Sequence, residues 1–542
     1  MVAIEPIEVP HLALWKSCVA ESLARTFGLV HRRGAGIDSD HPAMLGTNEY
    51  CRAIEENRVV PKPTASADDV AVSAYLSCLH HRLAHARIAN DAKLQATILA
   101  QTQEFKLGNA PWQDMYVRYF YYYWDYAYHE GGAPEYRSWQ DPRAGRGDLS
   151  YGVIEWQLPS RARIAIIGDI GTGTDQAAAV LSAAISLKPD AFLHVGDVYY
   201  SGTRFEMRHR LVELVETVCR FSRRRVPFFT VPGNHEYFVG AKPFLSTLDS
   251  GSLVDRATQR QRASYFALRS EDDGWQFLGL DTGFFGHYMN VAGSAAQATL
   301  ERLHLGPPVQ APASSDPYWP SQYNPYFPGA TGPGITPTDP TSPPPFVTVR
   351  PDELVWHEDK LKQFMGRSVL LSHHQLYSAL NICGVAQKQI TGSNGTTSAD
   401  PGDYDRLWIN TGLWRQFGEQ FGVRIAAWLW GHEHNLGIYA DNYRPTDWPT
   451  SGSDAEMFRP LPKGRCVGHG AIPVAESEAP YAARYPVPLK DPTLMLGVTN
   501  GWYNRGFELI ELAGAGAPLE INYYQIAGAD PTPLLVYHET VA

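Results

Sequence analysis

Cysteine is scarce in this sequence, and the cysteines that occur show no functional spacing. The 542 residues contain six cysteines, with no CxxC pair and no framework of a disulfide-rich domain. The N-terminal stretch MVAIEPIEVPHLALWKS carries acidic residues and prolines where a signal peptide has basic residues and an apolar block. No run approaches the ~18 apolar residues of a membrane span. The sequence therefore predicts reduced thiols, a cytoplasmic location and no transmembrane segment.

Positive charge is also in short supply. The formal net charge is −11, whereas binding to a phosphate backbone depends on clustered Lys and Arg. One basic cluster, Arg220 with residues 223–225, stands where a predicted helix ends, and the helix dipole favours cations there. We therefore predict no nucleic-acid-binding surface. The oligomeric state is not indicated by the sequence.

Residues 1–150 have the pattern of a helical accessory domain. Apolar residues recur at three- and four-residue spacing in segments 12–29, 68–86 and 91–105. The segment 115–130, MYVRYFYYYWDYAYHE, is rich in aromatic residues. Such a segment packs between two domains or forms a stacking platform for a ligand, and we predict the former.

Residues 151–542 alternate short apolar runs with helical segments, which is the pattern of an α/β catalytic domain. The runs RARIAIIGD, AFLHVGD and PFFTVPG are separated by predicted helices at 175–187 and 204–221. Parallel strands joined in this way gather ligands beyond their carboxyl ends. The Pro- and Gly-rich insertion at 306–350 is either a flap over a site or an exposed decoration, and residues 490–530 are predicted to be closing strands.

Polar residues follow five of the predicted strands, at the ends where ligands gather. Carboxylate, amide, phenol and imidazole groups are the ligand types that a pair of metal ions requires in a hydrolase. Two ions about 3.5–4 Å apart need a shared ligand, and a carboxylate with two oxygens suits that position, so Asp197 is the candidate bridge. The candidate metal ligands are Asp169, Asp197, Tyr200, Asn234, His373, His432 and His434.

The two later motifs, SHH and GHEH, each contain two histidines, and any of these could be a metal ligand. Of His373 and His374 we predict His373 as the ligand, because it comes first after the strand. In GHEH, His432 and His434 are two residues apart, so on an extended segment both rings point to one side and Glu433 points away. One imidazole can then bind each metal ion.

His235, which directly follows Asn234, is predicted to act on the substrate. The unperturbed pKa of histidine lies near neutrality, which suits a group that orients a phosphate and protonates a leaving oxygen. The two metal ions would polarise the phosphoryl oxygens and generate a hydroxide for in-line attack. A lone histidine in an apolar strand, His194, is predicted to be a core residue instead.

From residue 164 to about 438, these motifs resemble those of the calcineurin-like metallophosphoesterase superfamily. The usual first motif is Asp-x-His, but this chain has Asp169-Ile170-Gly171; the second usually ends in Asp or Asn, but here it ends in Tyr200. Both departures coincide in purple acid phosphatases, so the chain looks like a purple-acid-phosphatase-type member. The resemblance implies an α/β (α+β) fold, a two-sheet β-sandwich flanked by helices, and does not reach the first 150 residues.

The resemblance also implies how the ligands divide between the metal ions. It assigns a ferric ion to Asp169, Asp197, Tyr200 and His434, and a divalent ion, Fe²⁺, Zn²⁺ or Mn²⁺, to Asp197, Asn234, His373 and His432. It assigns His235 to the substrate.

The predicted function is acid-phosphatase-like hydrolysis of phosphate esters by a metal-activated hydroxide, with small-molecule phosphomonoesters as substrates. The main alternative is a phosphodiesterase that acts on nucleotide or phospholipid-type diesters, because the same metal pair serves both reactions. A non-enzymatic scaffold that kept the fold is a third hypothesis. It is disfavoured because every expected ligand position is filled.

Overall fold

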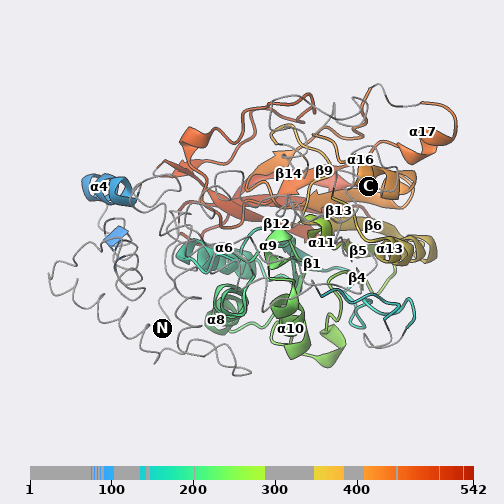
Figure 1. The fold of residues 1–542 in the computed structure, drawn as a ribbon, viewed down its shortest axis with the longest axis horizontal. Helices are drawn as coiled ribbons and strands as arrows, with labels where there is room; N and C mark the ends of the chain where they lie inside the picture. Colours follow the sequence, from blue (N-terminus) through green and yellow to red (C-terminus); the bar gives the residue numbers. More distant parts are fainter. Residues whose placement is uncertain are drawn as a thin grey trace, which may run out of the picture.

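Two mixed sheets of six strands each form the centre of the fold (Figure 1). The computed structural model describes residues 91–102, 135–141, 147–199, 202–237, 239–286, 347–381, 408–446, 450–499, 501–528 and 530–542, together with residues 75, 79, 82, 83, 86, 383 and 448. In spatial order, the first sheet contains β14 (Leu534–Val541), β13 (Leu519–Ile526), β12 (Arg505–Glu511), β1 (Arg163–Ile167), β2 (Ala191–His194) and β3 (Phe228–Thr230). The second contains β4 (Phe266–Arg269), β5 (Trp275–Gly279), β6 (Arg367–Ser372), β7 (Ile425–Trp430), β9 (Gly464–Val467) and β8 (Leu436–Ile438).

Each sheet has a parallel part in which several strands end at the same edge. In the first sheet β1, β2 and β3 pair in parallel, and β12, β13 and β14 extend the sheet by antiparallel pairing. In the second sheet β5, β6, β7 and β9 pair in parallel, with β4 and β8 antiparallel at the two ends. The loops that follow parallel strands therefore meet beyond a common edge, which is where such sheets bind ligands.

Strand β1 shows why its sequence is apolar throughout. Ile164 and Ile166 pack into the core between the two sheets, whereas Ala165 and Ile167 pack against the helices on the outer face. A strand that is buried on both faces has no alternation of polar and apolar residues. The run RARIAIIGD was predicted to be a central strand for this reason, and β1 lies inside its sheet.

Helices cover the outer face of each sheet. The first sheet is covered by α6 (Asp175–Ser186), α8 (Glu213–Ser222) and α10 (Lys242–Ser250), and the second by α13 (Pro351–Gln363) and α16 (Thr411–Phe417). The remaining elements are α4 (Ala92–Thr102), α7 (Arg204–Glu206), the π-helix η3 (Met207–Val212), α9 (Asn234–Tyr237), η4 (Ala257–Gln259), α11 (Gly283–Gly286), η5 (Gly418–Gln420), α17 (Ser453–Met457), η6 (Glu476–Glu478) and the strand pair β10 (Val498–Thr499) and β11 (Trp502–Tyr503).

The predicted two-sheet β-sandwich flanked by helices is confirmed. The predicted helix at 175–187 is α6, while the one at 204–221 is α7, η3 and α8 in succession, with a π-helical turn that its apolar spacing did not reveal. The prediction of closing strands at 490–530 was incomplete, because β14 lies beyond residue 530. Strands β8 and β9 were not predicted.

Part of the predicted N-terminal domain falls within the described residues. Helix α4 lies inside the predicted helix 91–105, and the described residues between 75 and 86 are helical. The predicted helix 12–29 and the aromatic segment 115–130 lie outside the described residues. The boundary near residue 150 stays a prediction.

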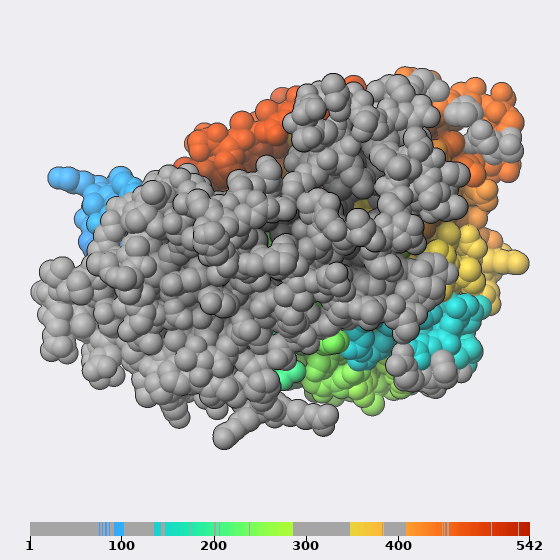
Figure 2. All heavy atoms as spheres, in the orientation of Figure 1, coloured from blue at the N-terminus to red at the C-terminus, as the bar shows by residue number. Residues whose placement is uncertain are grey.

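Residues 135–141 are not helical, and they pack on the part of the chain predicted to be catalytic. Tyr136 donates its hydroxyl to Glu353 at 2.7 Å, and the indole of Trp139 donates to the backbone oxygen of Asp352 at 2.7 Å. Figure 2 shows this region, in cyan, beside the yellow helix α13. The chain is therefore anchored to the second sheet's helix layer before β1 begins.

The 306–350 insertion is described only at its end. Residues 347–350 are buried, and Val349 contributes to the core beneath the second sheet's helices. Whether the rest forms a flap or an exposed decoration stays open, because residues 306–346 lie outside the described ranges.

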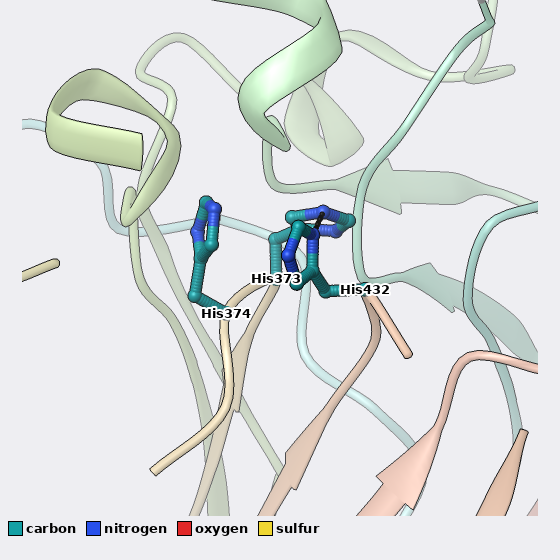
Figure 3. A group of neighbouring side chains, drawn as sticks. All are labelled: His373, His374 and His432. Carbon is teal, nitrogen blue, oxygen red and sulfur yellow. Dashed lines mark hydrogen bonds between the residues drawn. The ribbon is translucent and has the colours of Figure 1, made fainter. Parts of the chain in front are cut away.

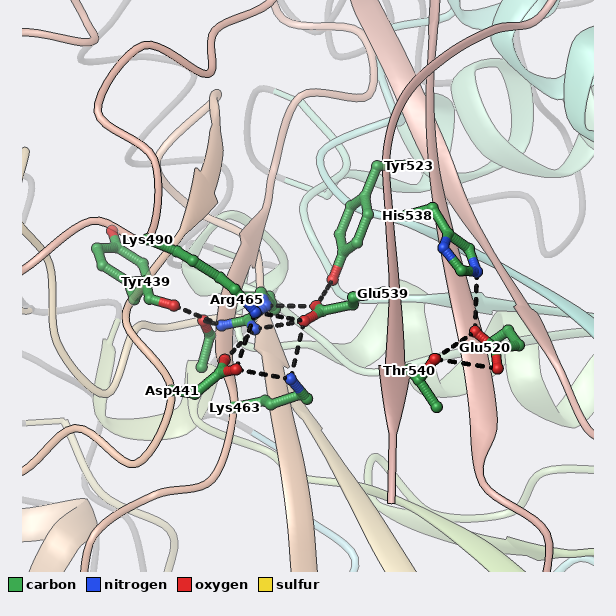
Figure 4. Close-up of polar contacts among 11 residues, drawn as sticks. Tyr439, Asp441, Lys463, Arg465, Lys490, Glu520, Tyr523, His538, Glu539 and Thr540 are labelled. Atoms are coloured by element: carbon green, nitrogen blue, oxygen red, sulfur yellow. Dashed lines mark hydrogen bonds and ion pairs between the residues drawn. The ribbon is translucent and has the colours of Figure 1, made fainter.

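An ion-pair network joins the two sheets, from β14 at the edge of the first sheet to β9, which neighbours the edge strand β8 of the second (Figure 4). Arg465 of β9 donates to both carboxylate oxygens of Glu539 of β14, at 2.6 and 2.7 Å. The two strands belong to different sheets, so this pair closes the sandwich on that side.

None of the helices in the described ranges combines the length and hydropathy of a membrane span.

Candidate metal centre

Six of the predicted site residues come together beyond the strand ends. Asp169 follows β1, Asp197 follows β2, and Asn234 opens the short helix α9 after β3. His373 follows β6, and residues 432–434 follow β7. The site therefore takes ligand groups from both sheets, as the common edge of the parallel strands requires.

The backbone at this edge adopts a conformation that side chains rarely favour. Asp169, Asp197, His432 and His434 have φ values of 55°, 74°, 71° and 26°. Such residues persist only where the surrounding structure holds them, and they cluster at functional sites. Each of these four turns directs a carboxylate or an imidazole into the site.

Glycines allow the ligand groups to approach the neighbouring backbone. A Cβ atom on Gly233 would lie 2.0 Å from Oδ1 of Asp197, and one on Gly431 would lie 2.6 Å from Oδ2 of Asp169. Neither distance is possible for a real side chain. The glycine that precedes Asn234 and the glycine that precedes His432 are thus required by the carboxylates beside them.

His373 has one ring nitrogen fixed to the backbone and the other turned into the site. Its Nδ1 lies 2.9 Å from the backbone oxygen of Val195, which can only accept a hydrogen bond. Its Nε2 lies 3.1 Å from Oδ1 of Asn234, 3.1 Å from Nδ1 of His432 and 3.2 Å from Oδ2 of Asp197. A backbone carbonyl that orients the outer nitrogen is the usual support of a metal-binding histidine.

The atoms around His373 Nε2 test whether a metal fits the site. Once Nδ1 donates to Val195, Nε2 presents a lone pair, and it faces oxygen and nitrogen atoms that also present lone pairs. Such a convergence is unfavourable unless a proton or a cation lies between the groups. Nitrogen and oxygen donors of this kind are the ligands of Zn²⁺, Mn²⁺ and iron, so the residues fit a metal site.

The electrostatics lead to the same conclusion. Burial alone would raise the pKa of Asp197, but His373 and His235 hold it well below its usual value. Burial would lower the pKa of His373, but Asp197 raises it to about 9, so this ring holds a proton among the acceptors. Burial and the neighbouring His373 lower the pKa of His432 to about 3, which leaves its lone pair free. A metal cation can replace the shared proton.

The ligand groups form two clusters that Asp197 connects. One contains Asp169, Asp197 and His434, and the other, drawn in Figure 3, contains His373, His374 and His432. Within each cluster, one ligand atom of every residue lies within 4.8 Å of the others. Since Asp197 Oδ2 also lies 3.2 Å from His373 Nε2, this carboxylate lies between the two clusters. That is the position expected of a bridging ligand.

The GHEH turn was predicted for the wrong reason. The segment is not extended, since His432 and His434 both have positive φ. The rings still separate as expected: His432 reaches His373, and His434 Nε2 lies 3.5 Å from Oδ1 of Asp169. Glu433 points away and accepts a hydrogen bond from Ser378 at 2.7 Å. The turn, rather than strand alternation, sends one imidazole to each cluster.

His235 lies beside the clusters and is more accessible than most of their members. Its backbone N–H donates to Oδ1 of Asp197 at 3.3 Å, and its Nε2 lies 3.7 Å from Oδ2 of the same carboxylate. Its ring packs edge-on against Tyr199, and its side chain is 19% exposed. The location suits the predicted contact with a substrate, which stays a prediction.

Of the two adjacent tyrosines in the second motif, the structure describes Tyr199 and not the predicted ligand. Tyr200 lies outside the described residues. The phenol found in the site belongs to Tyr199, which donates to Oδ1 of Asp169 at 2.6 Å and lies 3.0 Å from Nε2 of His434. The sequence reasoning missed Tyr199, although the pair of adjacent tyrosines could have signalled that either one can reach the site.

His194 was predicted to be a core residue, and the structure agrees. It is buried in β2, its Nδ1 lies 2.8 Å from Oγ1 of Thr230, and its ring packs against Phe228. Burial lowers the pKa of this histidine to about 4, so it is neutral.

The fold and the donor set together define a class of protein: a two-sheet sandwich with two candidate metal-binding clusters at the strand ends. A family model described as calcineurin-like phosphoesterase matches residues 162–436, which is just over half of the chain. The chain therefore belongs to the calcineurin-like phosphoesterase family. The match ends just after the GHEH segment and includes every residue of the two clusters.

Other comparisons add little. No curated protein matches the chain. Eleven chains of known structure do, among them the purple acid phosphatase PPD1 from yellow lupin (Lupinus luteus) seeds, with 12% identity and a TM-score of 0.33. The alignment covers 71% of this chain and 55% of that one, so the chain spans about half the length of the lupin protein.

Proposed function

We propose that this protein is a phosphomonoesterase that uses two metal ions. One observation carries the proposal: Asp197 lies between two clusters of ligand groups, and His373 Nε2 faces three lone-pair donors at 3.1–3.2 Å. The donors converge on a shared centre in a chain whose family hydrolyses phosphate esters.

The two clusters suggest how the ligands divide. We propose one metal ion at Asp169, Asp197, Tyr200 and His434, and a second at Asp197, Asn234, His373 and His432. By resemblance to purple acid phosphatases, the first is Fe³⁺ and the second Fe²⁺, Zn²⁺ or Mn²⁺. When bound, such a pair supplies Lewis acidity toward phosphoryl oxygens and lowers the pKa of water.

The residues of the chain supply orientation and proton transfer. Asn234 and His373 are fully buried, so they exclude bulk water from one side of the site. His235 retains access to solvent and lies against Asp197, so it is placed to hold the phosphoryl group and to protonate the departing oxygen. A small-molecule phosphomonoester is the substrate that we propose.

The support for a monoester over a diester lies in the motifs. Asp169-Ile170-Gly171 and the Gly196-Asp197-Val198-Tyr199-Tyr200 sequence follow the purple acid phosphatase pattern rather than the more general one of the family. A diesterase uses the same metal pair, and the surroundings of the site decide between the two.

The test compares two substrates on one preparation. Protein stripped of metal and reloaded with Fe³⁺ plus Zn²⁺, with Zn²⁺ or with Mn²⁺ is assayed with p-nitrophenyl phosphate and with bis(p-nitrophenyl) phosphate. We expect turnover that depends on metal and a higher kcat/KM for the monoester. A preference for the diester would replace the proposal by a phosphodiesterase, and less than one metal per chain after reloading would support the scaffold hypothesis.

A further inference from the structure

His374 is a buried histidine that lies in one of the two clusters but is not among the predicted metal ligands. It follows His373 at the end of β6, and its side chain is fully buried. Its ring lies 4.9 Å from that of His373 and 4.7 Å from that of His432, measured between centroids. In Figure 3 a contact between ring nitrogens joins His373 and His432, and no such contact joins His374 to either ring.

Thr282 determines which nitrogen of His374 carries the proton. The backbone N–H of His374 donates to Oγ1 of Thr282 at 3.1 Å, and Nδ1 of the same residue lies 3.0 Å from that oxygen. Among the described residues, Nδ1 of His374 is the acceptor that the hydroxyl proton of Thr282 can reach. The hydroxyl therefore donates to Nδ1, and the proton of the neutral ring is on Nε2.

The Nε2–H of His374 then has no acceptor in the described structure. The atom is buried and makes no hydrogen bond. A buried donor without an acceptor is unfavourable, so native structures seldom keep one unless a ligand or water accepts from it. One ring nitrogen of His374 lies within 4.8 Å of ligand atoms of both His373 and His432, which places this histidine beside the site where the phosphate would bind.

His194 shows that this arrangement is not a general property of buried histidines in the fold. It also contacts a threonine hydroxyl through Nδ1, and its Nε2 also lacks a partner. Thr230, however, donates its hydroxyl to the backbone oxygen of Val231 at 3.1 Å. His194 must then donate from Nδ1, and its free Nε2 is an acceptor. The two histidines are opposite tautomers, and of this pair His374 is the one that presents an unused donor.

We propose that His374 binds a phosphoryl oxygen of the substrate through Nε2–H and is not a metal ligand. The inference rests on the proposed function, because it needs a tetrahedral oxyanion at the metal centre. The chemistry recognised is a phosphoryl oxygen, of a phosphate ester or of the orthophosphate product. Metal binding by Nε2 would instead need its lone pair, and the Thr282 hydroxyl would then lose its acceptor.

Two substitutions separate the two nitrogens of the ring. His374→Asn keeps a polar atom near the position of Nδ1 and removes Nε2, while His374→Gln places an amide nitrogen near the position of Nε2. The readouts are metal content per chain and the Kd of orthophosphate for the metal-loaded protein, measured by calorimetry without turnover. His194→Asn is the matched control, since it removes another buried Nε2 that lacks a partner.

We expect His374→Asn to keep the wild-type metal content and to weaken orthophosphate binding by roughly tenfold or more, the size of one hydrogen bond to a charged group. His374→Gln should stay within about threefold of wild type, as should His194→Asn. Loss of metal in His374→Asn would make His374 a ligand and overturn the inference, and so would unchanged phosphate binding. If the wild type binds metal and phosphate but turns over no ester, the proposed function fails while the phosphate comparison still decides the role of His374.

Discussion

Two of the buried charge clusters in the described part of this protein differ in how completely their groups are paired. Around Arg465 (Figure 4), each charge has a partner: the guanidinium donates to Glu539 at 2.6 and 2.7 Å and to Asp441 at 2.8 Å, and Lys463 donates to Asp441 at 3.0 Å. Tyr523 donates its hydroxyl to Glu539 at 2.8 Å. At the strand ends, by contrast, Asp197, Asn234 and His432 all direct lone pairs toward His373.

This difference separates a structural cluster from a functional one. A network that matches donors to acceptors is satisfied by folding alone and fixes the geometry of the sandwich. A cluster of acceptors is satisfied only when a proton or a metal cation binds among them. Burial by itself does not distinguish the two, because Arg465 and Asp197 are equally inaccessible.

The largest effect is expected for Asp197→Asn, which removes the charge that connects the two ligand clusters. Metal content should fall, and turnover should fall by more than about 10²-fold, because even outer partners of metal ligands change affinity or activity by about 10–100-fold. The metal-free variant should unfold below the wild-type temperature, because the charge of Asp197 stabilises the protonated His373 that it contacts. Elemental analysis and calorimetry of the metal-free proteins check both statements. A fully loaded, active variant would show that Asp197 is not the bridge.

His235→Ala comes next. This side chain lies beside the clusters without belonging to them, so metal content should be unchanged. The kcat for an alkyl phosphate should fall by about 10²–10⁴-fold, the usual contribution of a general acid or base. Leaving-group dependence is the sharper readout. The loss should be small for p-nitrophenyl phosphate, whose leaving oxygen needs little protonation, and large for an alkyl phosphate. Equal losses on both substrates would assign His235 to binding rather than to proton transfer.

Glu539→Gln tests the structural cluster. Removing one charge of a buried pair leaves Arg465 without its full partner, and the cost should approach about 3 kcal/mol in the free energy of unfolding. Metal content and kcat of the folded variant should stay at wild-type values, because no residue of the network belongs to either ligand cluster. Chemical denaturation measures the first, and elemental analysis with the monoester assay the second. Loss of metal without loss of stability would remove the distinction between the clusters.

The same carboxylate gives the comparison a pH dependence. Burial would raise the pKa of Glu539, but Arg465 lowers it to about 2, below the value of 4.5 expected in the unfolded chain. A lowered pKa in the folded state stabilises the protein above pH 4.5, and this contribution is lost as the pH falls toward 2. The stability difference between wild type and Glu539→Gln should therefore shrink across that window. A constant difference would show that the ion pair is not its source.

Sequence patterns located the candidate site because its ligands are local features of strand ends. Asp169, Asp197 and Asn234 each end an apolar run, and parallel strands bring such ends together. What the patterns missed depends on contacts between distant segments. β14 has no strict alternation of polar and apolar residues, and its Glu539 pairs with Arg465, which lies 74 residues away in the sequence. The turn at GHEH depends on positive φ at two histidines, which residue alternation cannot indicate.

Substitution of the adjacent tyrosines is predicted to have the smallest effect on metal binding, and it compares two neighbouring residues within the site. Tyr199 hydrogen-bonds Asp169 and His434, which makes it an outer partner of predicted ligands, whereas the resemblance assigns the metal-bound phenolate to Tyr200. In protein loaded with Fe³⁺, Tyr200→Phe should abolish the visible absorption band. Tyr199→Phe should keep that band and weaken metal binding about tenfold, as expected when an outer partner is lost. If the band disappears in Tyr199→Phe and survives in Tyr200→Phe, the phenol that the structure places beside Asp169 is the ligand, and the spacing of the second motif is one residue shorter here.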